Sequence, residues 1–322
     1  MSLHAFTQLF QSADALPQPL PVAVAGGADP TVLEALRIAC DRGWVRPLVS
    51  GMESEVRRIA AESGIGLQGL TILEASDAAA AAVASVRSGE ARMLMKGQVS
   101  TPSLMRAVLD PVEGLRSDRV ICQVVLMEIR SVVSSLPVSP TESVREEHAR
   151  RLLLADTGIC IQPTLEQKSE ILRSAVHVAN ALGEATPRVA LLAATETVTE
   201  AMPETLVAAE LQRRGQAGEF PGCAVQGPLS FDLACDSDAA AKKSVRGPVV
   251  GAADILLFPN LVTANLTVKA IMYTANCRFG GILCGAACPV AFMSRADTTA
   301  TRLHSLALAI RLASTAQSRT QV

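Results

Sequence analysis

The sequence has few aromatic residues and no excess of either charge. Aromatic side chains make up 3% of its 322 residues, with one tryptophan and one tyrosine, so the core must be built from Ala, Val, Leu and Ile. Such a core suits helices packed closely on a parallel sheet. The 29 basic and 31 acidic residues leave a net charge of −2, which excludes the basic surface of a bulk nucleic-acid-binding protein. A few well-placed cations for a phosphorylated small molecule are still compatible with this balance.

The sequence also lacks the segments that direct a protein to export or to a membrane. Its first residues, Met1-Ser-Leu-His-Ala-Phe6, contain no basic region followed by an apolar core, so we predict no secretory signal. The longest run of small apolar residues, 78–86, is too short to cross a bilayer. We therefore expect a cytoplasmic protein that does not bind membranes.

Cysteine and histidine do not occur in a metal-binding pattern. The chain has eight cysteines and four histidines, and no two cysteines form a C-x-x-C pair. In a cytosolic protein such thiols are mostly buried and behave as small apolar side chains. We expect free thiols, no zinc site and no bound metal.

Apolar strands and amphipathic helices alternate along the first half of the chain. Strands are predicted over 20–24, 46–49, 70–73, 91–95 and 120–129. The predicted helices between them cover 29–40, 53–61, 76–86 and 101–108. Asp29 and Pro30 supply a cap and a first-turn proline to one of these helices. This alternation predicts an α/β fold with a parallel sheet covered by helices on both faces.

The second half continues the alternation, and the length suits one large or two ordinary domains. Its predicted strands are 152–155, 188–193, 223–225, 253–258, 281–284 and 289–293. Its predicted helices are 164–182, 203–214, 264–276 and a last helix through residue 310, and residues 236–243 are predicted as a polar helix or a turn. Ala and Leu positions on this last helix look exposed, which favours self-association. Residues 130–150, rich in Ser, Pro and charge, interrupt the pattern, and we expect a domain crossing or a surface insertion there.

Polar residues recur where predicted strands end. They are Lys96, Asp156, Thr195 with Glu196, Gly227 with Pro228, Asn260, and Ser294 with Arg295. Ligands of open parallel sheets bind outside the carboxyl ends of the strands. Polar groups at six such ends predict a cleft between two α/β domains.

Two of these strand ends have a specific chemistry. Lys96 follows a buried strand directly and is a candidate contact for a phosphate or a carbonyl, and Gly97 allows close approach of the backbone. The alternative is an ordinary strand-to-helix turn with an exposed lysine. Ser294 and Arg295 lie between a strand and a helix start, where backbone N–H groups stabilise anions and a guanidinium matches phosphate oxygens. The alternative there is that Asp297 or the threonine after it caps the helix and Arg295 is a surface charge.

These strand-end segments, in this order, resemble the phosphate acetyl/butyryltransferase family, and its butyryl-type branch most closely. The matching segments are residues 94–97, 152–156, 187–197, 227–229, 253–257, 280–282 and 294–297. The likeness covers roughly residues 20 to 312 and is thinnest over 130–150.

The resemblance implies an isocitrate/isopropylmalate-dehydrogenase-like architecture with a cleft between two α/β domains. The first domain would comprise residues 1–145 and 290–322, and the second residues 146–289. The implied reaction is acyl-CoA + phosphate ⇌ acyl phosphate + CoA, by direct attack in a ternary complex. Its partners would be short-chain acyl-CoA, CoA and phosphate, without nucleic acid, membrane or a resident cofactor, in a homodimer or higher homo-oligomer.

The resemblance also implies roles for individual residues. Ser294 and Arg295 would contact CoA and the developing charge, and Asp297 is the candidate base. Lys96 and Thr101 would lie at the phosphate or acyl side. The other implied substrate or CoA contacts are Gly97, Asp156, Glu196, Gly227, Pro228 and Asn265.

The sequence departs from the family pattern at four places around the implied site. Residues 298–301 contain no acid where acetyl-type members have one in the helix. Cys160, Gln226 and Val262 replace Asn, Asp and Glu. These changes fit an altered acyl specificity, or a CoA- or acyl-phosphate-binding protein without turnover. A metal- and NAD-dependent dehydrogenase of the same architecture would need paired aspartates at a strand end, which the sequence does not offer.

Overall fold

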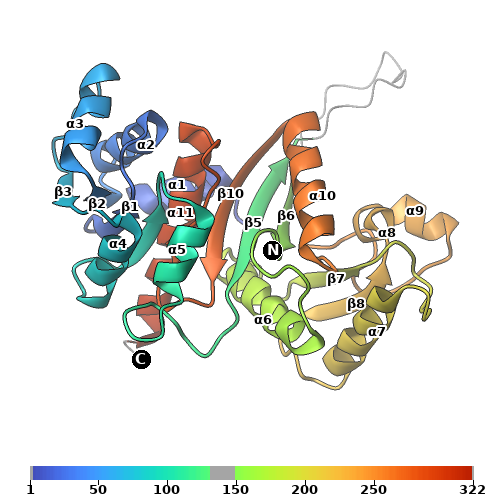
Figure 1. Cartoon of the computed structure of the whole chain (residues 1–322). Coiled ribbons are helices and arrows are strands. Elements are labelled where there is room, and N and C mark those ends of the chain that lie inside the picture. The colour runs from blue at the N-terminus through green and yellow to red at the C-terminus, as the bar shows by residue number, and fades with distance from the viewer. Residues whose placement is uncertain (1–2, 131–148, 321–322) are drawn as a thin grey trace, which may run out of the picture. The chain divides into compact units, whose positions relative to one another are not determined.

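The structure, a computed structural model, describes residues 3–130 and 149–320 (Figure 1). Most of the predicted domain crossing or insertion, residues 131–148, lies outside the described residues. The chain divides into two compact units. The central unit is Val124–Phe279 with the first residues of the chain, and the terminal unit is Phe6–Gln123 with Gly280–Val322. Strands and helices alternate in both, so the predicted α/β class is confirmed.

The terminal unit contains a mixed sheet of strand order β3-β2-β1-β4-β11-β10. Its strands are β1 (Leu20–Ala25), β2 (Val45–Gly51), β3 (Thr71–Glu74), β4 (Met93–Lys96), β10 (Cys277–Cys284) and β11 (Val290–Ala291). All neighbouring pairs are parallel except β10 and β11. The strands of the first alternating segment, β1 to β4, are parallel as predicted. A five-residue turn beginning at Gly285, with φ of 84°, reverses the chain between β10 and β11, and only antiparallel strands can be joined by so short a connection.

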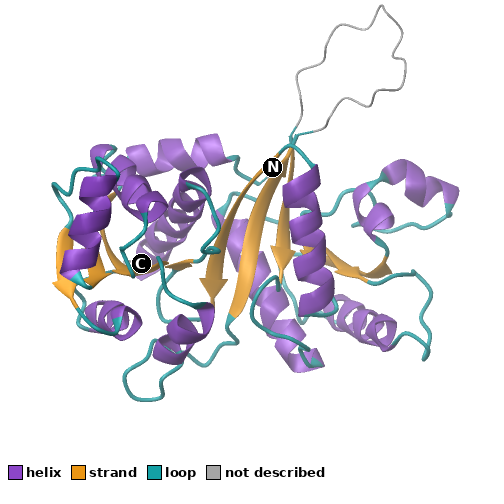
Figure 2. Cartoon of the chain, turned by 45° about the horizontal axis from the view of Figure 1, so that its top comes forward, coloured by secondary structure: helices purple, strands orange, loops and turns teal. Residues whose placement is uncertain are grey.

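Helices cover both faces of this sheet (Figure 2). They are α1 (Phe6–Asp14), α2 (Pro30–Asp41), α3 (Glu53–Glu62), α4 (Ala78–Arg87), α5 (Thr101–Val108) and α11 (Thr299–Thr320). α4 packs on α5, while α2 packs on α3 and α11. Side chains cap the helix starts as the sequence predicts, with Asp29 accepting the N–H of Val32 at 3.0 Å. The sequence did not predict α1, whose Phe6 ring stacks on His304 of α11 at 4.2 Å between centroids.

The apolar side chains of α11 lie inside the terminal unit. Leu306, Ala307, Leu308 and Ala309 are fully buried, because α11 packs against α1, α2, β4 and β11. The prediction that exposed Ala and Leu positions on this helix favour self-association is therefore wrong.

The central unit has the strand order β5-β6-β9-β7-β8. Its strands are β5 (Cys122–Ile129), β6 (Arg150–Ala155), β7 (Arg188–Leu192), β8 (Ala224–Leu229) and β9 (Ile255–Leu257). β5 and β6 are antiparallel and the remaining neighbours are parallel. A parallel pair would need a crossover, usually a helix, and the sequence predicts none between these two strands.

The helices of the central unit are α6 (Leu165–Ala181), α7 (Pro203–Gln216), α8 (Phe231–Cys235), α9 (Ser237–Lys242) and α10 (Leu261–Thr274). Thr164 and Gln167 form a reciprocal capping box at the start of α6, and Asn260 caps α10. Arg188 and Asp254 join β7 to the start of β9 through bonds of 2.8 and 3.0 Å. The Arg188–Asp254 pair fixes the amino ends of β7 and β9, and the two caps fix the helix starts that follow β6 and β9, near the predicted site residues of this unit.

Candidate functional site

Lys96 is the last residue of β4, and its side chain is buried at the carboxyl edge of the terminal unit's sheet. It is 1% exposed, so the alternative of an exposed lysine in an ordinary turn is wrong. The pKa of Lys96 is lowered to about 8, mainly by burial and then by the charges of Arg302 and Arg295, while Asp297 acts in the opposite direction. A cation in this position costs free energy unless an anion lies beside it.

Gly97 is required where β4 leaves the sheet. A Cβ on this residue would lie 2.0 Å from the carbonyl oxygen of Gly26. The N–H of Gly97 donates to Ala25, and that of Gln98 donates to Gly26 at 2.8 Å. The loops after β1 and β4 are therefore joined backbone to backbone, and this contact accounts for the glycine.

Arg302, which the sequence analysis missed, lies beside Lys96 in the first turn of α11. It is 0% exposed, and burial lowers the pKa of its guanidinium. Its Nε donates to Thr31 Oγ1 at 2.8 Å, and its Nη2 lies 3.8 Å from Asp29 Oδ1. Its Nη1 has no hydrogen-bond partner in the described part of the chain. The sequence did contain a sign that Arg302 is buried, because this residue lies on the same helix face as Leu306 and other apolar residues of α11.

The loop before α11 brings the predicted catalytic residues next to these cations. Ser294 and Arg295 are exposed and Asp297 is half-buried. The Asp297 carboxylate accepts the N–H of Ser294 at 2.8 Å, whereas Thr298 Oγ1 accepts the N–H of Thr301 at 3.3 Å. Of the two predicted caps, Thr298 is therefore the one that caps α11, and Asp297 instead closes the loop.

Arg295 is exposed, as the alternative of a surface charge expects. Its backbone carbonyl oxygen lies 3.5 Å from Arg302 Nη2, and its charge contributes to the lowered pKa of Lys96. We call Lys96, Arg295 and Arg302, together with the carboxylates of Asp29 and Asp297, the cation cluster. It combines three positive and two negative side chains at the carboxyl end of β4 and the start of α11. The arrangement can bind an anion and stabilise negative charge that develops beside it.

Thr101 begins α5 and is half-buried, and Ser100 caps that helix by accepting the N–H of Ser103 at 3.1 Å. The same loop borders a hollow of about 610 Å³ at the carboxyl ends of β1 to β4. Its lining includes Gly26, Gly27, Gly51, Ser76, Ser100 and Arg106. Glycines at these strand ends leave room where side chains would otherwise fill the edge of the sheet.

In the central unit, the side chain of Asp156 holds together the loop that follows β6. It is buried, and its carboxylate accepts the N–H groups of Gly158, Ile159 and Cys160 at 3.0, 3.2 and 2.7 Å. Burial, with help from this carboxylate, raises the pKa of the Cys160 thiol to about 12. Asn265 on α10 donates to the carbonyl of Thr157 in the same loop at 3.4 Å.

Gly227 and Pro228 are buried near the end of β8. A Cβ on Gly227 would lie 2.5 Å from that of Leu191, and its N–H donates to Gln212 at 2.9 Å. The preceding Gln226 bonds the carbonyl of Arg246 and the N–H of Val249 at 3.0 and 3.1 Å. Gln226 therefore has a structural role in holding the 246–249 loop. Glu196 lies half-buried in the loop after β7.

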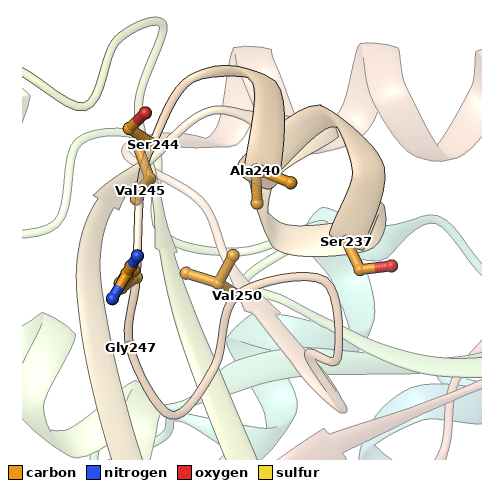
Figure 3. A pocket seen from close by; sticks show the side chains of 8 residues that line it. Ser237, Ala240, Ser244, Val245, Gly247 and Val250 are labelled. Carbon is orange, nitrogen blue, oxygen red and sulfur yellow. The ribbon is translucent and has the colours of Figure 1, made fainter.

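A second hollow, of about 450 Å³, lies against α9 in the central unit (Figure 3). Ser237, Ala240, Ser244, Val245, Gly247 and Val250 are among its lining residues, and Arg246 is the charged one. The hollow contains none of the predicted site residues, so we do not assign the candidate site to it.

The described residues contain neither a candidate metal site nor a candidate membrane span. Within 3–130 and 149–320, no group of three or more His, Cys, Asp and Glu side chains is arranged to hold a metal ion. No helix over these residues is long and apolar enough to cross a membrane. The eight cysteines are free, as predicted, although six of them are only partly buried.

Comparison with known proteins gives consistent similarities. A family model described as "Phosphate acetyl/butaryl transferase" matches residues 72–310. The chain is 37% identical over 295 residues to the phosphate butyryltransferase of Clostridium acetobutylicum, covering 91% of this chain and 93% of that protein. It is 36% identical over 289 residues to the phosphate acetyltransferase of Thermotoga maritima, covering 89% and 93%. A crystal structure of a branched-chain phosphotransacylase from Enterococcus faecalis V583 has a TM-score of 0.76 and 28% identity, covering 91% of this chain and 99% of that one.

Proposed function

Since this chain belongs to the phosphate acetyl/butyryl transferase family and is thus a phosphate acyltransferase, we propose that its cation cluster carries the reaction. The reaction is acyl-CoA + phosphate ⇌ acyl phosphate + CoA. A phosphate oxygen attacks the thioester carbonyl carbon, a tetrahedral oxyanion forms, and the C–S bond breaks as the thiolate leaves. Each stage has negative charge, which positioned cations and N–H donors stabilise. The single observation that carries the proposal is the burial of Lys96 beside Arg295 and Arg302.

Within this cluster we assign the loop residues to the thioester side. Arg295 is exposed and offers a planar fork to a phosphate of CoA or to the oxyanion. Ser294 Oγ accepts the N–H of Ala296 at 3.3 Å, and its own O–H can donate to the developing charge. Lys96 and Thr101 are assigned to the phosphate or acyl side.

Asp297 is our candidate for the base that takes the CoA thiol proton in the direction of acyl-CoA synthesis. A free thiol has a pKa of about 8.5, so a positioned acceptor speeds its attack. The bond between the Asp297 carboxylate and the Ser294 N–H holds this acceptor beside the two residues assigned to the thioester.

Further contacts to CoA or the acyl group are proposed from the family likeness. They are Gly97 in the terminal unit and Asp156, Glu196, Gly227, Pro228 and Asn265 in the central unit. We propose the isocitrate/isopropylmalate-dehydrogenase-like arrangement, with domains of residues 1–145 with 290–322 and of residues 146–289 and a cleft that brings both sets to one substrate. Limited proteolysis with and without CoA tests it, since protection confined to one domain would contradict a shared site.

We also propose that the enzyme is cytoplasmic, works without a resident metal or redox cofactor, and is a homodimer or higher homo-oligomer. Support for self-association comes from α10, where Val262, Leu266 and Tyr273 are 60%, 64% and 82% exposed. Light scattering of Leu266→Asp should show monomers where the unmodified chain shows dimers. Val112→Asp, at an exposed position outside α10, is the matched control, and equal masses for all three proteins would contradict the interface.

One assay tests the function and its acyl specificity. Purified protein is mixed with acetyl-, propionyl-, butyryl- or isobutyryl-CoA and phosphate, and free thiol is followed. We expect phosphate-dependent release with a short-chain substrate, and sulfate in place of phosphate as a matched anion should give none. CoA binding by calorimetry without release from any substrate would favour the alternative of a binding protein without turnover. The family assignment leaves no support for the dehydrogenase alternative.

A further inference from the structure

We propose that Arg302 is a phosphate-binding residue, and that Arg302 and Lys96 form a buried subsite for the phosphoryl group of inorganic phosphate. This inference rests on the proposed function, since it assigns a binding site to phosphate, one of the two substrates of that reaction. Nothing in the sequence comparison or in the family-derived roles singles out Arg302. The evidence for Arg302 is its burial, an N–H donor without a partner and the charges of the side chains around it.

The first argument is the unused donor. The Arg302 guanidinium has five N–H groups, and Nε alone makes a short bond, at 2.8 Å to Thr31. Nη2 lies 3.5 Å from the carbonyl oxygen of Arg295 and 3.8 Å from Asp29, and both distances are long for charged pairs. Nη1 is buried without a partner among the residues that the structure describes. A buried donor of this kind is unfavourable until an acceptor arrives.

The second argument is the charge around the donor. The cation cluster has three cations and two carboxylates, and both carboxylates already bond to the protein. Asp29 accepts the N–H of Val32 at 3.0 Å and the hydroxyl of Thr31 at 2.5 Å as the cap of α2. Asp297 accepts the N–H of Ser294 at 2.8 Å. These bonds occupy acceptor positions of both carboxylates, and the five side chains together keep a net positive charge, which favours binding of an anion.

The third argument separates the two possible sources of a phosphoryl group. A phosphate of CoA ends a long chain and is easily bound by exposed residues such as Arg295. Lys96 and Arg302 are 1% and 0% exposed, so a small free anion reaches them more easily than a phosphate group that is attached to the rest of CoA. The start of α11 adds backbone N–H groups to the same place. These features favour free phosphate over CoA as the occupant.

The test separates the two substrates by kinetics. Phosphate and butyryl-CoA are varied independently for the unmodified enzyme, Arg302→Met and Arg302→Lys. We expect Arg302→Met to raise the KM for phosphate about 10- to 100-fold, the size of one charge-assisted bond, and to change the KM for butyryl-CoA less than about twofold. Arg302→Lys keeps the charge without the fork and should recover part of the loss. Arg311→Gln, on the same helix but partly exposed, should match the unmodified enzyme.

Two outcomes overturn the proposal. One is an unchanged KM for phosphate in a folded Arg302→Met variant, with folding checked by thermal unfolding. The other is a rise in the KM for butyryl-CoA alone, which would assign Arg302 to CoA. Where Arg302→Met does not fold, Arg302→Lys gives the same comparison with a smaller expected effect.

Calorimetry with inorganic phosphate distinguishes a failure of this inference from a failure of the proposed function. If the unmodified protein releases no thiol from any acyl-CoA, the proposed function fails. Phosphate binding to the unmodified protein and about 10-fold weaker binding to Arg302→Met would still support the subsite. Equal phosphate binding by both proteins would overturn it.

Discussion

Replacing Lys96 by Met should make the protein more stable and inactive. Burial lowers the pKa of this lysine from 10.5 in the unfolded chain to about 8 in the folded protein. Below pH 8 the folded protein must hold a buried ammonium, and the shift corresponds to at most about 3 kcal/mol of lost stability. The unfolded chain binds more protons between pH 8 and 10.5, so the stability of the unmodified protein rises as pH rises through that range. Methionine has similar length and no charge, so Lys96→Met should remove this pH dependence.

Urea unfolding at several pH values measures the effect. Trp44 is the single tryptophan, is fully buried and lies in the same unit as Lys96, so its fluorescence reports on the relevant part of the chain. We expect Lys96→Met to exceed the unmodified protein in free energy of unfolding at pH 7, and the difference to shrink toward pH 10. Lys242→Met, at an exposed lysine, should change neither the free energy of unfolding at pH 7 nor its dependence on pH.

Phosphate provides the second arm of this experiment. An anion beside Lys96 offsets the cost of the buried ammonium, so added phosphate should stabilise the unmodified protein and have less effect on Lys96→Met. The reasoning would be refuted by a variant that is less stable at pH 7, with the same pH dependence and the same response to phosphate as the unmodified protein. Lys96 would then be a cation that the folded protein already satisfies.

Three further substitutions test the loop residues and the β4 turn. Arg295→Ala should weaken CoA binding by about 1.5–3 kcal/mol in calorimetry, the range for a charge-assisted bond, and unchanged affinity would contradict a contact with CoA. Asp297→Asn should lower kcat by more than about 10²-fold with CoA affinity kept if Asp297 is the base; a loss of thermal stability alone would assign it to loop closure. Gly97→Ala should destabilise the protein by about 1–3 kcal/mol in urea unfolding, because the added methyl meets the Gly26 carbonyl at 2.0 Å, and an unaffected midpoint would show that the β1 and β4 loops separate easily.

Much of the fold could be predicted because each element has a local signal. The period of apolar residues distinguished strands from helices, and Asp29 and Pro30 marked a helix start that the structure confirms. The period of apolar residues did not reveal the two antiparallel pairs, because an apolar strand has the same pattern in either direction; the absence of a predicted helix between the paired strands was the available signal. Helix α1 was missed because its stability comes from contacts such as Phe6 on His304, which join distant parts of the chain.

The candidate site was predicted in part for the same reason. Position after a strand was enough to single out Lys96 and Arg295, since strand ends share one edge of a sheet. The sequence could not choose between Asp297 and Thr298 as the helix cap, because both residue types cap well and the loop geometry decides between them. Arg302 was overlooked because an arginine next to an apolar stripe is usually solvated, and its burial depends on α2 supplying Asp29 and Thr31.

The place of β11 in the terminal unit's sheet sets an order of events during synthesis. β11 lies between β4 and β10, yet it is made after all the other strands. While the ribosome is still making residues 124–279, β4 has an unpaired edge, and such edges invite pairing with other chains. The main segment of the central unit, Val124–Phe279, can therefore fold before the terminal unit is complete. Slower translation of the codons that follow residue 124 should increase aggregation of the unfinished chain. A chaperone that covers the unpaired edge of β4 should reduce this aggregation.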